Sequence, residues 1–336
     1  MNWMALDIGG ANIKLANGNG YAASYVFPMW NQFEGLASEL RKLITEAPSS
    51  DHLAVTMTGE LADCFESKSA GVTHILQSVT EGSDGRHTRV YTVDGNLVSL
   101  QVAKNDPLKV AASNWHALAR FGGRFCPDET ALLIDIGSTS SDIVPLLNGS
   151  PAATAITDTG RLVAGELVFT GVERSPVCAL VKEVPFRNQV CPVAQEVFAT
   201  SSDVYLLLAD LVESKTNRNT ADRRPATKAA ARSRMGRMIC VAGDDFNHRD
   251  AVAMAQYVAD AQVSHIAEAM KRVLHRMPSE PQTVVLSGHG EFLAKRVLKE
   301  MGLSPTIISL AKELGTSVSR CGSAHALAVL AREATS

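Results

Sequence analysis

The sequence lacks any long apolar run and is poor in aromatic residues. No stretch of 18 consecutive apolar residues occurs, which argues against a membrane-spanning helix. Phe, Trp and Tyr make up only 5% of the chain, so base-stacking platforms for nucleic acid are not expected. The net charge of −3 provides no basic field that would attract a polyanion. The composition therefore predicts neither a nucleic-acid partner nor a membrane partner.

Cysteine is also scarce, with six residues and no Cys-x-x-Cys pair. Such scattered thiols argue against both a zinc site and a disulfide framework. We interpret them as small buried hydrophobic residues, which is the usual behaviour of free cysteine. The first residues enter an apolar strand directly, without a charged region or a cleavage site of the kind found in secretion signals. These features predict a cytoplasmic protein.

Two short loops that begin with Asp-x-Gly are the most informative feature. Each follows a brief apolar run: residues 7–14 read DIGGANIK, and residues 135–142 read DIGSTSSD. A strand that ends in this way places a carboxylate beside free backbone N–H groups, which suits a phosphate bound together with Mg²⁺. In a chain of 336 residues with 46% hydrophobic content, the repeat predicts two like halves with a cleft between them.

The apolar periodicity predicts α/β structure on both sides of the repeat. The expected strands are 3–7, 53–57, 131–135, 143–147 and 283–286. The expected helices are 33–47, 107–121, 250–277, 292–301 and one that opens at 321–326. Turns rich in Asn and Gly are expected at 17–20, 94–96 and 148–149, because these residues tolerate positive φ.

Residues 214–237 form a strongly basic segment with eight Lys and Arg residues against one acid, Asp222. A solvated helix face or a mobile loop is one interpretation, since charge runs often have no other role. A lid that receives an anionic substrate is the other, and the sequence leaves both open.

The order of these motifs resembles the superfamily of acetate and sugar kinases, heat-shock proteins and actin. The resemblance consists of two phosphate loops, a late Gly-rich loop at 287–291 and a C-terminal connecting helix. It implies an α/β, ribonuclease H-like fold with two domains and a central cleft. The first actin-like domain would comprise residues 1–125 and 313–336, and the second would comprise residues 126–312 with 214–237 as a basic insertion.

Residues 165–180, which read GELVFTGVERSPVCAL, look like the hydantoinase A and oxoprolinase branch of this superfamily. The stretches 111–115, 222–227 and 243–245 resemble its small single-chain members, which are linked to tetrahydromethanopterin-dependent one-carbon metabolism. The characterised archaeal relatives in that group make methanofuran.

That resemblance implies a transferase. The archaeal enzymes join an aminomethylfuran-methyl diphosphate to the phenol oxygen of γ-glutamyltyramine, form an aryl ether and release diphosphate. A bacterial counterpart would act in methylofuran biosynthesis on this phenol or on a tyrosine analogue. The implied partners are therefore anionic small molecules, and the implied cofactor is Mg²⁺. The sequence leaves open whether an adenine nucleotide binds and whether the protein forms a homodimer.

The resemblance also implies roles for particular residues. Asp7 and Asp135 would be catalytic and would hold Mg²⁺, because hard cations prefer oxygen ligands. Three further carboxylates are candidates for the general base that accepts the phenol proton: Asp142, Glu166 and Asp245. Residues expected to bind phosphate or substrate are Gly9, Gly10, Asn12, Lys14, Lys104, Asn114, Gly137, Ser138, Thr139, Ser140, Thr170, Gly171, Arg224, Arg232, Gly288, His289 and Gly290. For Arg224 and Arg232, a surface salt bridge is the competing interpretation.

Two other functions compete with the transferase. The first is an ATP-dependent small-molecule kinase or a hydantoinase-type amide hydrolase of the same fold. The Gly-rich loop at 287–291 favours this alternative. Against it stand Ala11 and Asn12, where kinases of the superfamily usually carry Thr or Ser, and the brevity of the chain. The second is a non-catalytic nucleotide-binding switch protein, which would need a partner surface.

Overall fold

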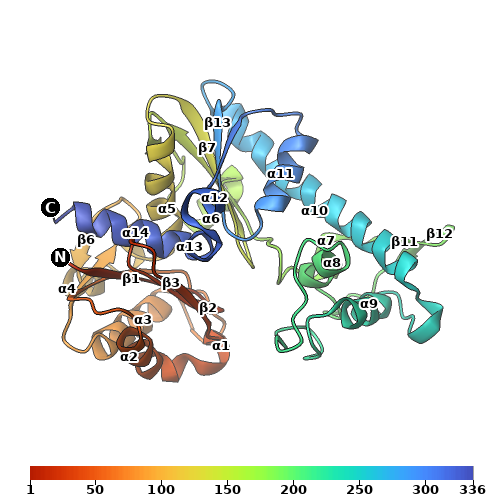
Figure 1. Cartoon of the computed structure of the whole chain (residues 1–336), viewed down its shortest axis with the longest axis horizontal. Helices are drawn as coiled ribbons and strands as arrows, with labels where there is room; N and C mark the ends of the chain where they lie inside the picture. Colours follow the sequence, from red (N-terminus) through yellow and green to blue (C-terminus); the bar gives the residue numbers. More distant parts are fainter. Residues whose placement is uncertain (336) are drawn as a thin grey trace.

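The computed structural model describes residues 1–335, apart from the side chain of Asp244, as two halves that each contain a mixed sheet (Figure 1). The first sheet has the order β3-β2-β1-β4-β5-β6. Its strands are β1 (Trp3–Ile8), β2 (Asn12–Ala16), β3 (Ala22–Val26), β4 (His52–Met57), β5 (His87–Tyr91) and β6 (Leu97–Ser99).

The second sheet repeats this plan with the order β10-β8-β7-β13-β14. Its strands are β7 (Thr130–Ile136), β8 (Ser141–Leu147), β9 (Ser150–Pro151), which pairs with β8, β10 (Leu167–Val168), β13 (Thr283–Ser287) and β14 (Thr306–Ser309). In each half, the strand before the Asp-Gly loop pairs antiparallel with the next strand and parallel with a later one. The duplication expected from the sequence is thus present in the strand topology.

Helices cover both faces of the first sheet. All six residues of β1 are buried, as expected for a strand that is covered on two sides. The helices α2 (Leu36–Glu46) and α3 (Lys68–Gly82) share one apolar core with β1 and β4. The C-terminal helix α14 (Gly322–Glu333) packs on the opposite face through small residues such as Ala324 and Ala328.

The helix α5 (Asn114–Gly122) lies beside α14, and the two helices occupy the space between the sheets (Figure 1). Trp115 and Leu118 of α5 join a core with Leu133 of β7 and Val285 of β13. α5 therefore packs against the second sheet, although the expected division assigns it to the first domain. We retain the domain boundaries near 125 and 312 as a proposal.

A long helix, α10 (His248–Arg276), runs from the second sheet to a group of short elements that we call the outer subdomain, residues 177–247 (Figure 1). Its elements are α7 (Val177–Leu180), β11 (Glu183–Phe186), β12 (Gln189–Pro192), α8 (Ser201–Leu207), α9 (Lys228–Arg237) and a 3₁₀ turn at Gly243–Asp245. Asn247 and Asp250 form a reciprocal capping box that begins α10.

The remaining helices connect these parts. They are α1 (Met29–Gln32), α4 (Leu100–Asn105), α6 (Asp158–Ala164), α11 (Glu291–Glu300), α12 (Leu310–Leu314) and α13 (Thr316–Arg320), and short 3₁₀ turns lie at Phe33–Gly35, Pro107–Lys109 and Gly123–Phe125. In residues 1–335, no helix has the length and apolarity needed to cross a membrane.

Two expectations about local structure were wrong. The helix expected from residue 107 begins only at Asn114, because Ala112 has a φ of +48° and the Ser113 hydroxyl is drawn into bonds with Thr56 and the Tyr91 carbonyl. The six cysteines are free, but only Cys126 and Cys321 are buried. The other four are half-buried or, at Cys240, exposed, so the expectation of buried thiols fails for them.

The basic segment 214–237 is partly a core element of the outer subdomain. Arg234 is 0% exposed, and its guanidinium lies 2.6 Å from Asp203 Oδ1 and 2.9 Å from Asp222 Oδ1. A solvated face therefore does not describe the whole segment, because one of its arginines forms a buried ion network.

We expect Arg234→Ala to lower the free energy of unfolding by about 3–5 kcal/mol, because it leaves the buried Asp203 carboxylate without its partner. Arg224→Ala is the matched control: the Arg224 side chain is 60% exposed, lies 3.8 Å from Asp222, and should contribute less than about 1 kcal/mol. Urea unfolding of both variants measures the difference, and equal effects would contradict the assigned role of the buried network.

Candidate active site

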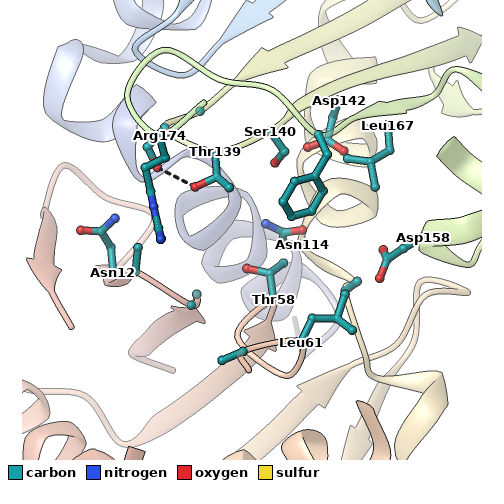
Figure 2. A pocket seen from close by; sticks show the side chains of 18 of the residues that line it. Asn12, Thr58, Leu61, Asn114, Thr139, Ser140, Asp142, Asp158, Leu167 and Arg174 are labelled. Atoms are coloured by element: carbon teal, nitrogen blue, oxygen red, sulfur yellow. Dashed lines mark hydrogen bonds between the residues drawn. The ribbon is translucent and has the colours of Figure 1, made fainter. Parts of the chain in front are cut away.

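A cavity of about 640 Å³ lies between the two halves and brings both Asp-Gly loops together. We call residues 7–14 loop 1; they span the end of β1, the turn and the start of β2. Residues 135–142 are loop 2 and span the end of β7, the turn and the start of β8. Figure 2 shows Asn12, Asn114, Thr139 and Ser140 around this space. The expected site residues that line it are Asp7, Gly9, Gly10, Asn12, Lys14, Asn114, Asp135, Gly137, Ser138, Thr139, Ser140 and Asp142.

A lysine lies beside Asp7 and interacts electrostatically with both leading carboxylates. The Lys14 Nζ atom is 3.6 Å from Asp7 Oδ2. Although burial lowers the pKa of Lys14, Asp7 and Asp135 together raise it above its ordinary value. Burial raises the pKa of Asp135 to about 6, and neighbouring Asp142 adds to the shift. Burial also raises the pKa of Asp7, against the opposing effects of Lys14 and Asn114. These buried charges create a place where a cation and a polyanion can be held together.

The residues at the loops fit Mg²⁺ that arrives with a phosphate group. The Oδ1 atom of Asp7 is buried and has no hydrogen-bond partner among the described residues. Residues 1–335 contain no cluster of three or more His, Cys, Asp or Glu side chains that would hold a metal without help. Mg²⁺ commonly uses one or two carboxylates and completes its shell with phosphate oxygens and water. Asp7 and Asp135 match that requirement.

The segment 170–175 braces loop 2, and its Arg174 and Ser175 also line the cavity. Val172 N donates to the Gly137 carbonyl, and Arg174 N donates to the Ser138 carbonyl, both at 3.0 Å. A Cβ atom at Gly171 would lie 2.5 Å from Gly137 O, so only glycine permits this approach. Thr170 is buried and bonded to Ser175 and Gln262. Thr170 and Gly171 therefore shape the loop and do not themselves line the cavity.

The Gly-rich loop at 287–291 also packs against loop 2. Gly290 N donates to the Ile136 carbonyl at 3.0 Å, and His289 Nε2 lies 3.1 Å from Glu173 Oε1. Gly288, His289 and Gly290 are absent from the cavity lining among the described residues. These residues approach the backbone of loop 2 closely and do not face the cavity, so a direct role in binding substrate is not supported for them.

Glu166 was wrongly expected at the site. Its carboxylate is 0% exposed, and its Oε1 atom accepts hydrogen bonds from the backbone N and the hydroxyl of Thr154, each at 2.7 Å. The group is therefore committed to holding the chain after β9, and it does not reach the cavity lining.

Four other expected residues also lie away from the cavity. Lys104 is exposed on α4, and the other three belong to the outer subdomain. The structure does not bring these side chains to the two loops: Lys104, Arg224, Arg232 and Asp245. These four residues were expected at the site because of their charge and the local sequence pattern. Neither property shows how distant segments pack, and that packing decides which side chains face the cavity.

The structure adds residues that the sequence did not single out. Arg161 is 1% exposed, lies over the Trp115 ring at 4.0 Å and pairs with Asp142 at 2.9 Å. Arg174 lies over the ring of Trp30 at 4.4 Å. This contact joins the segment 170–175, which braces loop 2, to the first half. Asp142 is thus partnered by a guanidinium, although burial raises its pKa.

Glu60 is the most important of the added residues. It follows β4 by three positions, lines the cavity and is 1% exposed. Burial raises the pKa of Glu60 to about 7, although its own backbone N–H and the Lys68 ammonium favour the charged form. An acid directly after a glycine, in the turn that follows the buried strand β4, was the available signal.

The duplicated sheets and the cavity between them define a protein of the acetate and sugar kinase, heat-shock protein and actin fold, as expected. The structure is similar to that of an ATP-dependent caprolactamase from Pseudomonas jessenii, with a TM-score of 0.51 and 10% identity, over 96% of this chain and 70% of that chain. The chain belongs to the hydantoinase/oxoprolinase family, whose model matches residues 51–330. The family membership inferred from residues 165–180 is confirmed.

Two archaeal relatives carry the same name, (4-{4-[2-(gamma-L-glutamylamino)ethyl]phenoxymethyl}furan-2-yl)methanamine synthase. The protein of Methanocaldococcus jannaschii is 31% identical over 97% of this chain and 96% of its own length. The protein of Methanococcus vannielii is 28% identical over 60% of this chain and 91% of its own length. These relatives support an enzyme of the transferase type.

Gly171→Ala should weaken the binding of Mg²⁺-diphosphate by roughly 10-fold or more, because the new methyl group would push against the backbone of loop 2. Gly35→Ala is the control, since the nearest atom to its added Cβ is 4.0 Å away. Isothermal titration calorimetry measures both affinities, and an unchanged affinity for Gly171→Ala would show that the brace does not set the loop.

Glu60→Gln should change the pH dependence of stability. The pKa of Glu60 is raised from 4.5 to about 7 in the folded protein, so the folded state binds this proton more tightly than the unfolded state does. The free energy of unfolding of the unmodified protein therefore falls as the pH rises between these values. The glutamine of the variant does not titrate, so its free energy of unfolding relative to that of the unmodified protein should increase by about 3 kcal/mol from below pH 4.5 to above pH 7. Urea unfolding across this range tests the prediction, and a constant difference would refute the assigned shift.

Proposed function

We propose that this protein condenses an aminomethylfuran-methyl diphosphate with the phenol oxygen of γ-glutamyltyramine or a tyrosine analogue, and releases diphosphate. The reaction would serve methanofuran or methylofuran biosynthesis. The observation that carries the proposal is the 31% identity to the archaeal synthase over 97% of this chain. The name of that relative describes an aryl ether in which a phenoxy oxygen joins a furan-bearing methylene carbon.

The cavity supplies what such a transfer needs at the leaving group. The methylene carbon is attached to an electron-rich furan, so it ionises readily once the charge on its diphosphate is neutralised. Catalysis then consists mainly of positioning the reactants and stabilising the departing charge. Lys14 contributes a positive charge at loop 1, and the backbone of Gly9, Gly10 and Gly137 lies at the same cavity wall.

Asp7 and Asp135 would hold Mg²⁺ at this point. When bound, the ion would neutralise negative charge on the diphosphate. The first loop carries Ala11 and Asn12 at the cavity, where a kinase of this fold would present a hydroxyl to the transferred phosphoryl group. The pattern favours phosphate as a leaving group over phosphate as the group transferred.

The cavity lining also contains apolar side chains that suit two aromatic rings. Trp30, Leu61 and Phe169 line it together with Leu167, and Phe169 is 65% exposed while Leu61 is 56% exposed. Figure 2 shows Leu61 and Leu167 at the side of the space where Asp158 also points inward. Exposed apolar groups in a concave site are suited to bind flat hydrophobic rings such as furan and phenol.

A mass-spectrometric assay tests the proposal. Purified protein with Mg²⁺, the furan diphosphate and each acceptor should form the ether together with an equal amount of diphosphate, whereas ATP should remain unchanged in a parallel reaction. ATP turnover without ether would favour the kinase or amide hydrolase, and the absence of both reactions would favour a nucleotide-binding switch protein.

Asp135→Asn should lower kcat by roughly 100-fold or more without unfolding the protein, because the variant loses a carboxylate beside Lys14 that we assign to Mg²⁺. Asp128→Asn is the matched control, since Asp128 is exposed two residues before β7. Steady-state kinetics measure both, and full activity of Asp135→Asn would remove that carboxylate from the mechanism.

A further inference from the structure

Three of the six carboxylates that line the cavity are already committed. Asp142 Oδ1 pairs with Arg161 at 2.9 Å, and the Asp7 and Asp135 carboxylates both face Lys14. The remaining acidic residues of the lining are Glu60, Asp63 and Asp158. Asp63 is exposed to solvent, whereas Glu60 is almost completely buried.

Lys68 bonds to another acid more closely than to Glu60. The Lys68 Nζ atom lies 2.5 Å from Asp158 Oδ2 and 3.7 Å from Glu60 Oε1, which is beyond hydrogen-bonding distance. Lys68 belongs to α3 of the first half, and Asp158 belongs to α6 of the second half. The ammonium is therefore fixed by an ion pair between the halves, and Oε1 is the Glu60 oxygen that it approaches at 3.7 Å.

The second oxygen of Glu60 has no hydrogen-bond partner. The Oε2 atom is buried, and no described residue donates a hydrogen bond to it. A buried carboxylate oxygen in a cavity requires a partner, because an unsatisfied polar atom costs free energy. The hydroxyl group of an acceptor would supply such a partner.

We infer that Glu60 is the general base that removes the proton from the acceptor phenol, and that Lys68 and Asp158 position it. This inference rests on the proposed function. In the step, the bond between the methylene carbon and the bridging oxygen breaks, and diphosphate leaves with the electron pair. The phenol oxygen forms the new bond to carbon, and its proton passes to Glu60 Oε2. Glu60 later returns that proton to solvent.

The surroundings of Glu60 suit this task. The groups that face it are the ammonium of Lys68 from α3, the carboxylate of Asp158 from α6 and backbone N–H groups, including that of Ala112. Burial raises the pKa of Glu60 to about 7, which leaves a substantial ionised fraction at neutral pH. A base with a pKa near the working pH combines availability with driving force for accepting a proton.

The test is the pH profile of kcat/KM for Glu60→Gln with two acceptors. The unmodified protein should gain activity as the pH rises through about 7. The variant should lose roughly 100-fold or more in kcat and should lack this rise. Both proteins receive the same diphosphate, so titration of the substrate cannot explain a difference between them.

A fluorinated phenol that is already ionised at the assay pH provides the second acceptor. It needs no base, so it should restore most of the activity of Glu60→Gln while changing the unmodified protein little. Glu66→Gln, an exposed position on the same loop, should keep the normal profile. The far-UV circular dichroism spectrum of each variant checks that it is folded.

The outcomes separate the two ideas. If the unmodified protein makes ether but Glu60→Gln keeps the same pH profile, or if the ionised acceptor gives no rescue, the role of Glu60 is overturned and the transferase stands. If the unmodified protein makes no ether with either acceptor, the proposed function fails and this inference fails with it.

Discussion

The packing of α5 against α14 is the constraint on which the cavity depends. These two helices lie between the sheets, so their separation fixes how far loop 1 stands from loop 2. The contact is close because small residues make it: a Cβ atom at Gly322 would lie only 3.2 Å from Leu118 Cδ1. α14 continues with Ala324, Ala326 and Ala328, all 0% exposed. Larger side chains here would separate the sheets and with them the two loops.

Two further contacts join the halves at the cavity itself. Arg174 stacks over Trp30, and Lys68 pairs with Asp158. Figure 2 shows Arg174 beside Asn12 on one side of the space and Asp158 on the other. The cavity is therefore bounded by side chains from both halves, and a movement of one half would change the surroundings of Glu60 and of loop 2 together.

Much of the fold was predictable because its signals are local. The two Asp-Gly loops, the turns at 17–20 and 148–149 and the long helix α10 follow from short-range periodicity and from residues that accept positive φ. Loop residues such as Gly9 and Ser138 could be assigned because each loop is a continuous stretch.

The rest of the site depends on contacts between distant segments. Glu166 was misplaced because its partner, Thr154, is identified only by the three-dimensional arrangement. Asp245 carries a suitable charge but lies in the outer subdomain. Glu60 was missed because Lys68 and Asp158, which distinguish it from other acids near a strand end, come from two different halves of the protein.

The central claim is that diphosphate leaves from carbon during the reaction in the cavity. Isotope tracing tests this claim most directly. The furan diphosphate would carry ¹⁸O at the oxygen that bridges the methylene carbon and phosphorus. We propose cleavage of the carbon–oxygen bond, so the label should leave entirely with diphosphate, and the ether should contain only the oxygen of the acceptor phenol. Label retained on the furan-bearing product would show cleavage at phosphorus and would contradict the account.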